Sequence, residues 1–141
     1  MVNMNLYIRD LLNKYKDVRS VKNDYNGHKY IGCIIFNKNI TYSYGYNIYN
    51  KFNKNVFSNS IHAEEDAIYK LKYTKKKKKV NVLIFRINKS FNKFMTVLPC
   101  YKCRLKLKYG LIKKGYNLNK IYCTNVIDNK INFIVIKKSE L

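Results

Sequence analysis

The pattern of apolar and polar positions predicts one helix and two strands in the first third of the chain. From Leu6 to Tyr15, apolar residues recur at helical spacing, which predicts an amphipathic helix packed on a sheet. Tyr30 to Phe36 is a nearly continuous apolar run, typical of a buried strand, and Asn37-Lys38-Asn39 predicts a hairpin turn after it. Ile40 to Tyr49 alternates in the manner of a strand, so Asn47 is predicted on the face opposite a row of tyrosines.

The second half of the chain predicts the rest of a mixed sheet. Val80 to Ile87 is apolar on both faces, as an interior parallel strand is, and Cys103 to Tyr109 predicts a helix that ends near Gly110. Lys120 to Val126 and Ile131 to Ile136 predict two final strands. The connector between these strands is too short for a parallel crossover, so the last strand is predicted to be antiparallel. We therefore expect a single domain over residues 1–141. Its predicted fold class is α/β, with three α/β/α layers and a mixed five-stranded sheet.

Two short motifs contain the candidate chemistry. His62-Ala63-Glu64 begins a predicted helix, and Pro99-Cys100-Tyr101-Lys102-Cys103 begins another. A histidine, a glutamate two residues later and a downstream Pro-Cys-x-x-Cys form the signature of zinc deaminases. Zinc held by three protein ligands keeps an open position, where it lowers the pKa of a bound water to about 7. We predict that His62, Cys100 and Cys103 are the zinc ligands. The two cysteines are three residues apart and so share one helix face.

Glu64 is the predicted catalytic acid and base. Ala67, Ile68 and Leu71 follow it at helical spacing, so the carboxylate stands at the head of an apolar stripe that should face the core. Because Glu64 is not a ligand in this pattern, it is free to transfer protons. The alternative is a closed structural zinc site with an incidental glutamate. The sequence offers no nearby fourth Cys or His to close such a site, which favours catalytic zinc.

These motifs resemble those of the cytidine and deoxycytidylate deaminase superfamily, over roughly residues 30–136. The resemblance implies a zinc-dependent hydrolase that deaminates a cytosine-type base of a free nucleoside or nucleotide and releases ammonia. It also implies a homo-oligomer. Gly45-Tyr46-Asn47 is similar to the end of the second strand in deoxycytidylate and tRNA deaminases, which implies substrate binding by Asn47. The backbone around Ala63 and Cys100 would line the pocket. The other interpretation of Asn47 is an ordinary turn asparagine.

The substrate within this superfamily stays open. The segment between Asn47 and Ser60 lacks the added metal-binding residues of deoxycytidylate deaminases, and the short final hairpin resembles the free-nucleoside branch instead. Phe52 and Phe57 lie among lysines in this segment, where they either cover a base or pack onto the body of the domain. Two further alternatives are a nucleic-acid base deaminase, acting on tRNA adenosine or single-stranded cytosine, and a zinc-stabilised nucleic-acid-binding domain without turnover.

The formal net charge of +21 indicates attraction to phosphate, on a nucleotide or on nucleic acid. Lysine greatly outnumbers arginine, as in proteins from AT-rich genomes, so part of the excess is compositional. Lys75 to Lys79 is an unbroken lysine run, either a solvated connector or a centre of polyanion binding. His28, a lone histidine in a turn-rich segment, is interpreted as solvated.

Cysteine usage and the lack of long apolar runs predict an intracellular protein. Cys33 and Cys123 lie inside apolar runs and are predicted to pack as small hydrophobic side chains, in preference to forming a disulfide. No apolar run approaches the roughly 20 residues of a membrane span, and the first residues do not resemble a signal peptide. We therefore expect a reducing, cytoplasmic location and no membrane partner.

Overall fold

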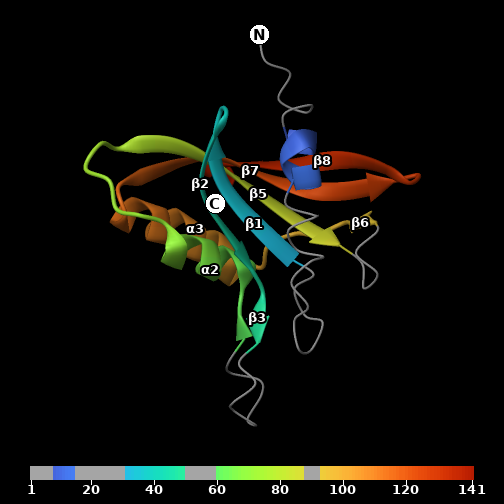
Figure 1. Ribbon diagram of the computed structural model, residues 1–141, viewed down its shortest axis with the longest axis horizontal. Helices are drawn as coiled ribbons and strands as arrows, with labels where there is room; N and C mark the ends of the chain where they lie inside the picture. Colours follow the sequence, from blue (N-terminus) through green and yellow to red (C-terminus); the bar gives the residue numbers. More distant parts are fainter. Residues whose placement is uncertain (1–7, 15–30, 50–59, 88–92) are drawn as a thin grey trace.

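A six-stranded mixed sheet forms the centre of this computed structural model, which describes residues 8–14, 31–49, 60–87 and 93–141 (Figure 1). The strand order is β2-β1-β5-β7-β8, and β6 pairs with β5. The strands of the sheet are β1 (Ile31–Asn37), β2 (Ile40–Tyr46), β5 (Lys78–Ile87), β6 (Phe94–Met95), β7 (Tyr116–Ile127) and β8 (Lys130–Lys137). A separate two-stranded ribbon joins β3 (Ile48–Tyr49) and β4 (Ser60–Ile61).

Helices cover both faces of the sheet, so the predicted three-layer α/β/α fold is confirmed. On one face, α2 (Ala63–Lys70) and α3 (Tyr101–Lys113) lie side by side over a core that includes Ile84 and Leu107 (Figure 1). The helix at residues 8–14 packs on the other face, against a second apolar cluster. The chain ends in a short 3₁₀ turn, η2 (Lys138–Glu140). No helix in the described part of the chain is both long and apolar enough to cross a bilayer.

The strand β5 is the central strand of the sheet. It pairs antiparallel with β1 and parallel with β7, and β8 runs antiparallel to β7 as predicted. Asp128 and Asn129 form the turn between the last two strands with φ of 50° and 61°. Positive φ at both central residues is the signature of the hairpin turn that matches strand twist. The five predicted strands form the main path, and β6 is a two-residue addition that the apolar pattern did not indicate.

The predicted end of the cysteine helix was wrong. The helix α3 continues through Gly110 to Lys113, and the chain turns at Gly115, which has φ of +91°. Only glycine fits there, because an added Cβ would lie 1.9 Å from the carbonyl oxygen of Thr74. Gly110 is instead an interior helix residue that faces Ile68 of α2. The following strand, β7, also starts earlier than predicted, at Tyr116.

The predicted alternation of β2 breaks at a β-bulge. Ile35 pairs with Ser43 and Phe36 pairs with Thr41, which leaves Tyr42 without a pairing partner in β1. The bulge turns Tyr42 to the side of α2 and α3, where its ring packs edge-on against Tyr116 at 5.7 Å. Tyr44 and Tyr46 remain on the opposite face, in the cluster with the helix at residues 8–14.

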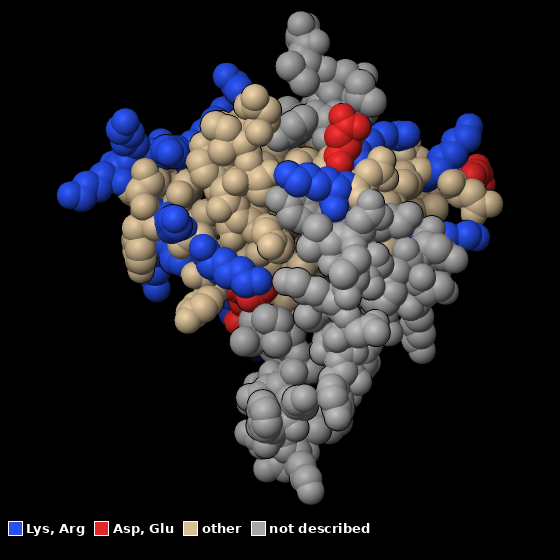
Figure 2. All heavy atoms as spheres, in the orientation of Figure 1, with Lys and Arg blue, Asp and Glu red and all other residues tan. Residues whose placement is uncertain are grey.

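Basic side chains outnumber acidic ones on the described surface (Figure 2). Figure 2 shows lysines and arginines projecting at the left end, where the loop between α2 and β5 and the last turn of α3 lie in Figure 1. The run Lys75–Lys79 belongs to this end, and all its members except Lys78 are exposed. Between Ala67 and Ile127 the sequence contains no Asp or Glu. The residues between Ala67 and Ile127 therefore contribute only basic charges to this end of the molecule.

Candidate metal centre and active site

Two helix starts meet at the site. His62 is the N-cap of α2 and Cys100 is the N-cap of α3, both with extended backbone. The Sγ atom of Cys100 accepts a hydrogen bond of 3.3 Å from the backbone N–H of Cys103. This bond satisfies one of the N–H groups that a helix start leaves without a partner. Pro99 precedes the cap, in a segment without regular secondary structure that leads into the helix.

The three predicted ligands lie together. The Nδ1 atom of His62 is 3.1 Å from the Sγ atom of Cys103, and the Sγ atoms of Cys100 and Cys103 are 3.0 Å apart. The three donor atoms all lie within 4.8 Å of one another. One imidazole nitrogen and two sulfurs are a donor set that suits zinc with one position open. Cys103 is buried while His62 and Cys100 are exposed, so the cluster is reached from one side.

The environment of Cys103 keeps its thiol protonated in the metal-free protein. Burial raises the pKa of this thiol, and hydrogen bonds to Cys100 and Glu64 raise it further. A metal ion binds the thiolate, so metal uptake at Cys103 releases a proton. Desolvation by burial is the largest of these effects on the pKa of Cys103.

Glu64 shares a small cavity with the three ligands. The cavity holds about 250 Å³, and Glu64 is only 4% exposed beside it. The lining residues are Ile31, Asn47, His62, Glu64, Ile84, Val97, Leu98, Pro99, Cys100 and Cys103. Val97 to Pro99 lie in the segment between β6 and α3, so this segment borders the site. The arrangement places a buried carboxylate and the three donor residues around one partly open cavity.

Asn47 fixes the start of α2. Its Oδ1 atom accepts a hydrogen bond of 3.0 Å from the backbone N–H of Ala63, and its own N–H donates to the carbonyl of Ile31. The side chain of Asn47 also lines the cavity. Ala63 is buried and does not line the cavity, and its N–H already donates to Asn47. The substrate contacts predicted for Asn47 and Ala63 stay predictions.

A close contact between β2 and α2 sets the position of His62. A Cβ on Gly45 would lie 2.3 Å from the backbone nitrogen of Ala67, so only glycine lets the helix approach this strand. The hydroxyl of Ser43 donates to the carbonyl of Ala67 at 2.6 Å. The small side chains of Ala63 and Ala67, the only alanines of the chain, face the same contact.

Sequence reasoning missed Asp66. Its carboxylate is 4% exposed and accepts a hydrogen bond of 3.0 Å from the backbone N–H of Tyr46. The same Oδ2 atom is 2.8 Å from the Nζ atom of Lys70. Asp66 therefore ties α2 to the end of β2. Its spacing of three from the buried Ala63 could have indicated this buried position.

Of the other residues that the sequence analysis singled out, two lie in the core and three lie outside the described residues. Cys33 and Cys123 are fully buried free thiols on the α2 and α3 side of the sheet, as predicted. Burial raises the pKa of Cys123 to about 12. His28, Phe52 and Phe57 lie outside the described residues.

Together, these observations define an α/β domain with a His-Cys-Cys cluster at two helix starts that could hold a metal ion. The family model of the cytidine and deoxycytidylate deaminase zinc-binding region matches residues 9–117. The match includes both motifs, and the chain belongs to this family.

Two solved structures are similar to the chain, both of dCMP deaminase from the cyanophage S-TIM5. The apo form has 15% sequence identity and a TM-score of 0.49, and the complex with dCMP and dUMP has 12% identity and a TM-score of 0.48. In both comparisons the similarity covers 84% of this chain and 98% of the other chain. A search of curated proteins finds no significant match.

Proposed function

We propose that this protein is a zinc-dependent hydrolytic deaminase that acts on a cytosine-type base of a free nucleoside or nucleotide. The observation that carries the proposal is the convergence of three metal-type donors and one buried carboxylate on a single small cavity. The donor atoms of His62, Cys100 and Cys103 lie within 4.8 Å of one another, and Glu64 lines the same space. The family match, to a zinc-binding region, supports the choice of metal.

His62, Cys100 and Cys103 would hold the zinc ion, which when bound supplies a hydroxide at neutral pH. Glu64 would take one proton from the attacking water and deliver it to the ring nitrogen of the base. It would then transfer the remaining proton of the added hydroxyl group to the leaving amino group. The carbon gains an oxygen and loses ammonia, so the amino group becomes a carbonyl. The burial of Glu64 keeps bulk water away from this transfer.

The cavity supports a single base as the reacting group. At about 250 Å³ it lies below the usual range of about 300–1,000 Å³ for ligand sites, so the sugar and phosphate would remain at its mouth. Ile31, Ile84 and Val97 provide apolar surface for the ring. The side-chain oxygen of Asn47 accepts a hydrogen bond from the N–H of Ala63, which leaves the side-chain NH₂ group to donate to the substrate.

The test is product detection by mass spectrometry with the full-length, zinc-loaded protein. Substrates are cytidine, deoxycytidine and their monophosphates, with single-stranded DNA and tRNA as polymeric alternatives. We expect a cytosine-to-uracil mass change on at least one of the four small substrates. Glu64→Gln should retain zinc and lose at least about 100-fold in rate, the lower range for general acid–base catalysis.

Glu65→Gln is the matched control. Glu65 neighbours Glu64 in sequence but lies outside the cavity and pairs with Lys106 at 3.0 Å, so its substitution should preserve the rate. Turnover of polymers alone would overturn the assignment to free nucleotides. If zinc binds at the predicted ligands and no substrate is turned over, the assignment as a cytosine deaminase would be overturned.

A further inference from the structure

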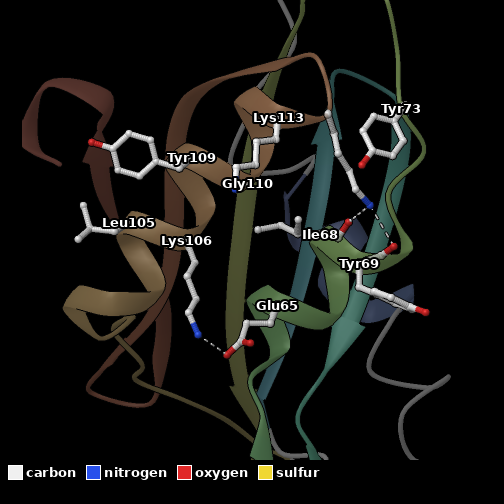
Figure 3. Close-up of a pocket in the computed structure, with 10 residues that line it drawn as sticks. Glu65, Ile68, Tyr69, Tyr73, Leu105, Lys106, Tyr109, Gly110 and Lys113 are labelled. Carbon is white, nitrogen blue, oxygen red and sulfur yellow. Dashed lines mark hydrogen bonds and ion pairs between the residues drawn. The ribbon is translucent and has the colours of Figure 1, made fainter.

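A second, larger hollow lies away from the metal cluster. It is a groove of about 820 Å³ between the outer faces of α2 and α3, and none of the three predicted metal ligands lines it. Figure 3 shows Leu105 and Tyr109 on the α3 side, Tyr69 on the α2 side, and Ile68 between the helices. We call this surface the helix groove. The deaminase chemistry proposed above does not use it.

The helix groove exposes aromatic rings. Tyr69 is 84% exposed, Tyr73 is 77% exposed and Tyr109 is 54% exposed. The Nζ atom of Lys114 lies 5.4 Å from the ring centre of Tyr73, which leaves most of that ring in solvent. Tyrosine rings held at a rim with their faces accessible are suitable platforms for stacking of unpaired bases.

The groove leads into the lysine-rich end of the molecule. Lys113 lines it, and the run Lys75–Lys79 follows Thr74, in the loop at the end of the groove and the first two residues of β5. The backbone N–H of Thr74 donates to the carbonyl of Lys114, which joins this loop to the end of α3. Within the described residues only two ion pairs occur, Lys70–Asp66 and Lys106–Glu65. Lys113 and the lysine run therefore have no acidic partner in the described structure.

Charge complementarity selects an anionic occupant. A second copy of the chain would present the same basic surface, with a formal net charge of +21 on each partner. Like charges in direct contact lie well within the Debye length of about 8 Å and repel. An acidic peptide matches the charge but has no planar bases to place on the exposed rings. A single-stranded nucleic acid offers both phosphates and unpaired bases.

We propose that the helix groove binds single-stranded nucleic acid. Bases stack on Tyr69 and Tyr73, while Lys113 and the run Lys75–Lys79 pair with phosphates. Duplex binds more weakly here, because its bases are already stacked on each other and offer the tyrosines no free face. The proposal needs no catalytic turnover, so it stands or falls separately from the deaminase assignment.

The experiment is fluorescence anisotropy with the zinc-loaded full chain and labelled oligo(dT) and oligo(rU), repeated over a range of salt concentrations. Tyr69→Ser/Tyr73→Ser should weaken binding about 5- to 150-fold for each stacked base that is lost. Tyr69→Phe/Tyr73→Phe keeps the rings and should bind like the unmodified chain. The rings are highly exposed, so these variants should fold normally, which zinc content and circular dichroism will verify.

Charge variants locate the phosphate contacts. Lys76→Gln/Lys113→Gln should reduce the slope of log affinity against log salt by about 1.4, since each phosphate contact on a single strand contributes about 0.7. The matched control, Lys93→Gln/Lys130→Gln, removes the same charge at the opposite ends of β5 and β7 and should change the slope less.

Three results would overturn the proposal. The first is equal affinity for duplex of the same length or for polyglutamate, which would leave only charge attraction. The second is unchanged oligonucleotide affinity in Tyr69→Ser/Tyr73→Ser. The third is a change from oligomer to monomer in that variant, measured by light scattering, without loss of oligonucleotide binding; a second copy would then occupy the groove.

Discussion

Substitution of Gly45 by alanine tests the contact that positions α2, the helix that begins after His62. The new Cβ would lie 2.3 Å from the nitrogen of Ala67 and 2.5 Å from the carbonyl oxygen of Ala63. Real Cβ atoms essentially never approach within 3.0 Å of another atom, and both neighbours here are backbone. The helix α2 must therefore move away from β2 by about 1 Å, a shift that overpacked cores accommodate only with strain.

The expected loss follows from the hydrogen bonds that this movement weakens. They join Ser43 to the carbonyl of Ala67, Asp66 to the N–H of Tyr46, and Asn47 to the N–H of Ala63. Overpacking costs about 1–3 kcal/mol, and each buried polar group left unpaired costs about 1–3 kcal/mol. We expect Gly45→Ala to lower the free energy of unfolding by about 3–6 kcal/mol, a large fraction of the 5–15 kcal/mol typical of a domain.

Urea unfolding monitored by circular dichroism gives the free energy, and zinc content reports the effect on His62. Gly110→Ala is the matched control, because its Cβ would meet only side-chain atoms of Ile68, at 3.1 Å. The gain in helix propensity of up to about 1 kcal/mol offsets that crowding, so this variant should be close to neutral. A Gly45→Ala protein within about 0.5 kcal/mol of wild type, with full zinc, would refute the reasoning.

Four further substitutions test individual side chains. Asp66→Asn should lower the free energy of unfolding by about 1–2 kcal/mol, because it weakens the hydrogen bond to Tyr46. Lys70→Met should lower it by less than about 1 kcal/mol, because Lys70 is half exposed. Equal losses in the two variants would assign the effect to the ion pair between Asp66 and Lys70. Lys114→Met removes an ammonium that donates to three carbonyls at the end of α2 and should cost about 1–3 kcal/mol in urea unfolding, so an unchanged midpoint would contradict that role. The pKa of Cys123 is raised from 9.0 to about 12, so its stabilising effect is complete below pH 9 and is lost as the pH rises towards 12. The stability difference between wild type and Cys123→Ala should therefore fall by about 1.4 kcal/mol from pH 8 to pH 10; a constant difference would exclude the shift.

The sequence predicted the elements better than their ends. Strands and helices follow from local apolar spacing, and the antiparallel last strand follows from a connector too short for any crossover. The end of α3 depends instead on which glycine takes positive φ. Gly115 does so under the carbonyl of Thr74, whereas Gly110 faces Ile68 inside the helix, and both contacts come from distant parts of the chain.

The sequence predicted those residues of the candidate site whose type is restricted by the chemistry they perform. Few arrangements other than a metal site explain the pattern of His62, Cys100 and Cys103, and their donor atoms do lie together. The supports of the site were not predicted. The burial of Asp66 and the close approach at Gly45 depend on how α2 packs against β2, and local sequence does not encode that packing.

Lys114 joins α2 and α3 at the end opposite the His-Cys-Cys donor cluster. It lies just after α3, and its Nζ atom donates to the carbonyls of Ile68, Tyr69 and Leu71 at the end of α2. The helices are thus joined at their C-terminal ends whether or not an ion joins their N-terminal ends. We expect the metal-free domain to stay folded with its donors close together, so that zinc enters a preformed site, unlike a small zinc finger that folds only around its ion.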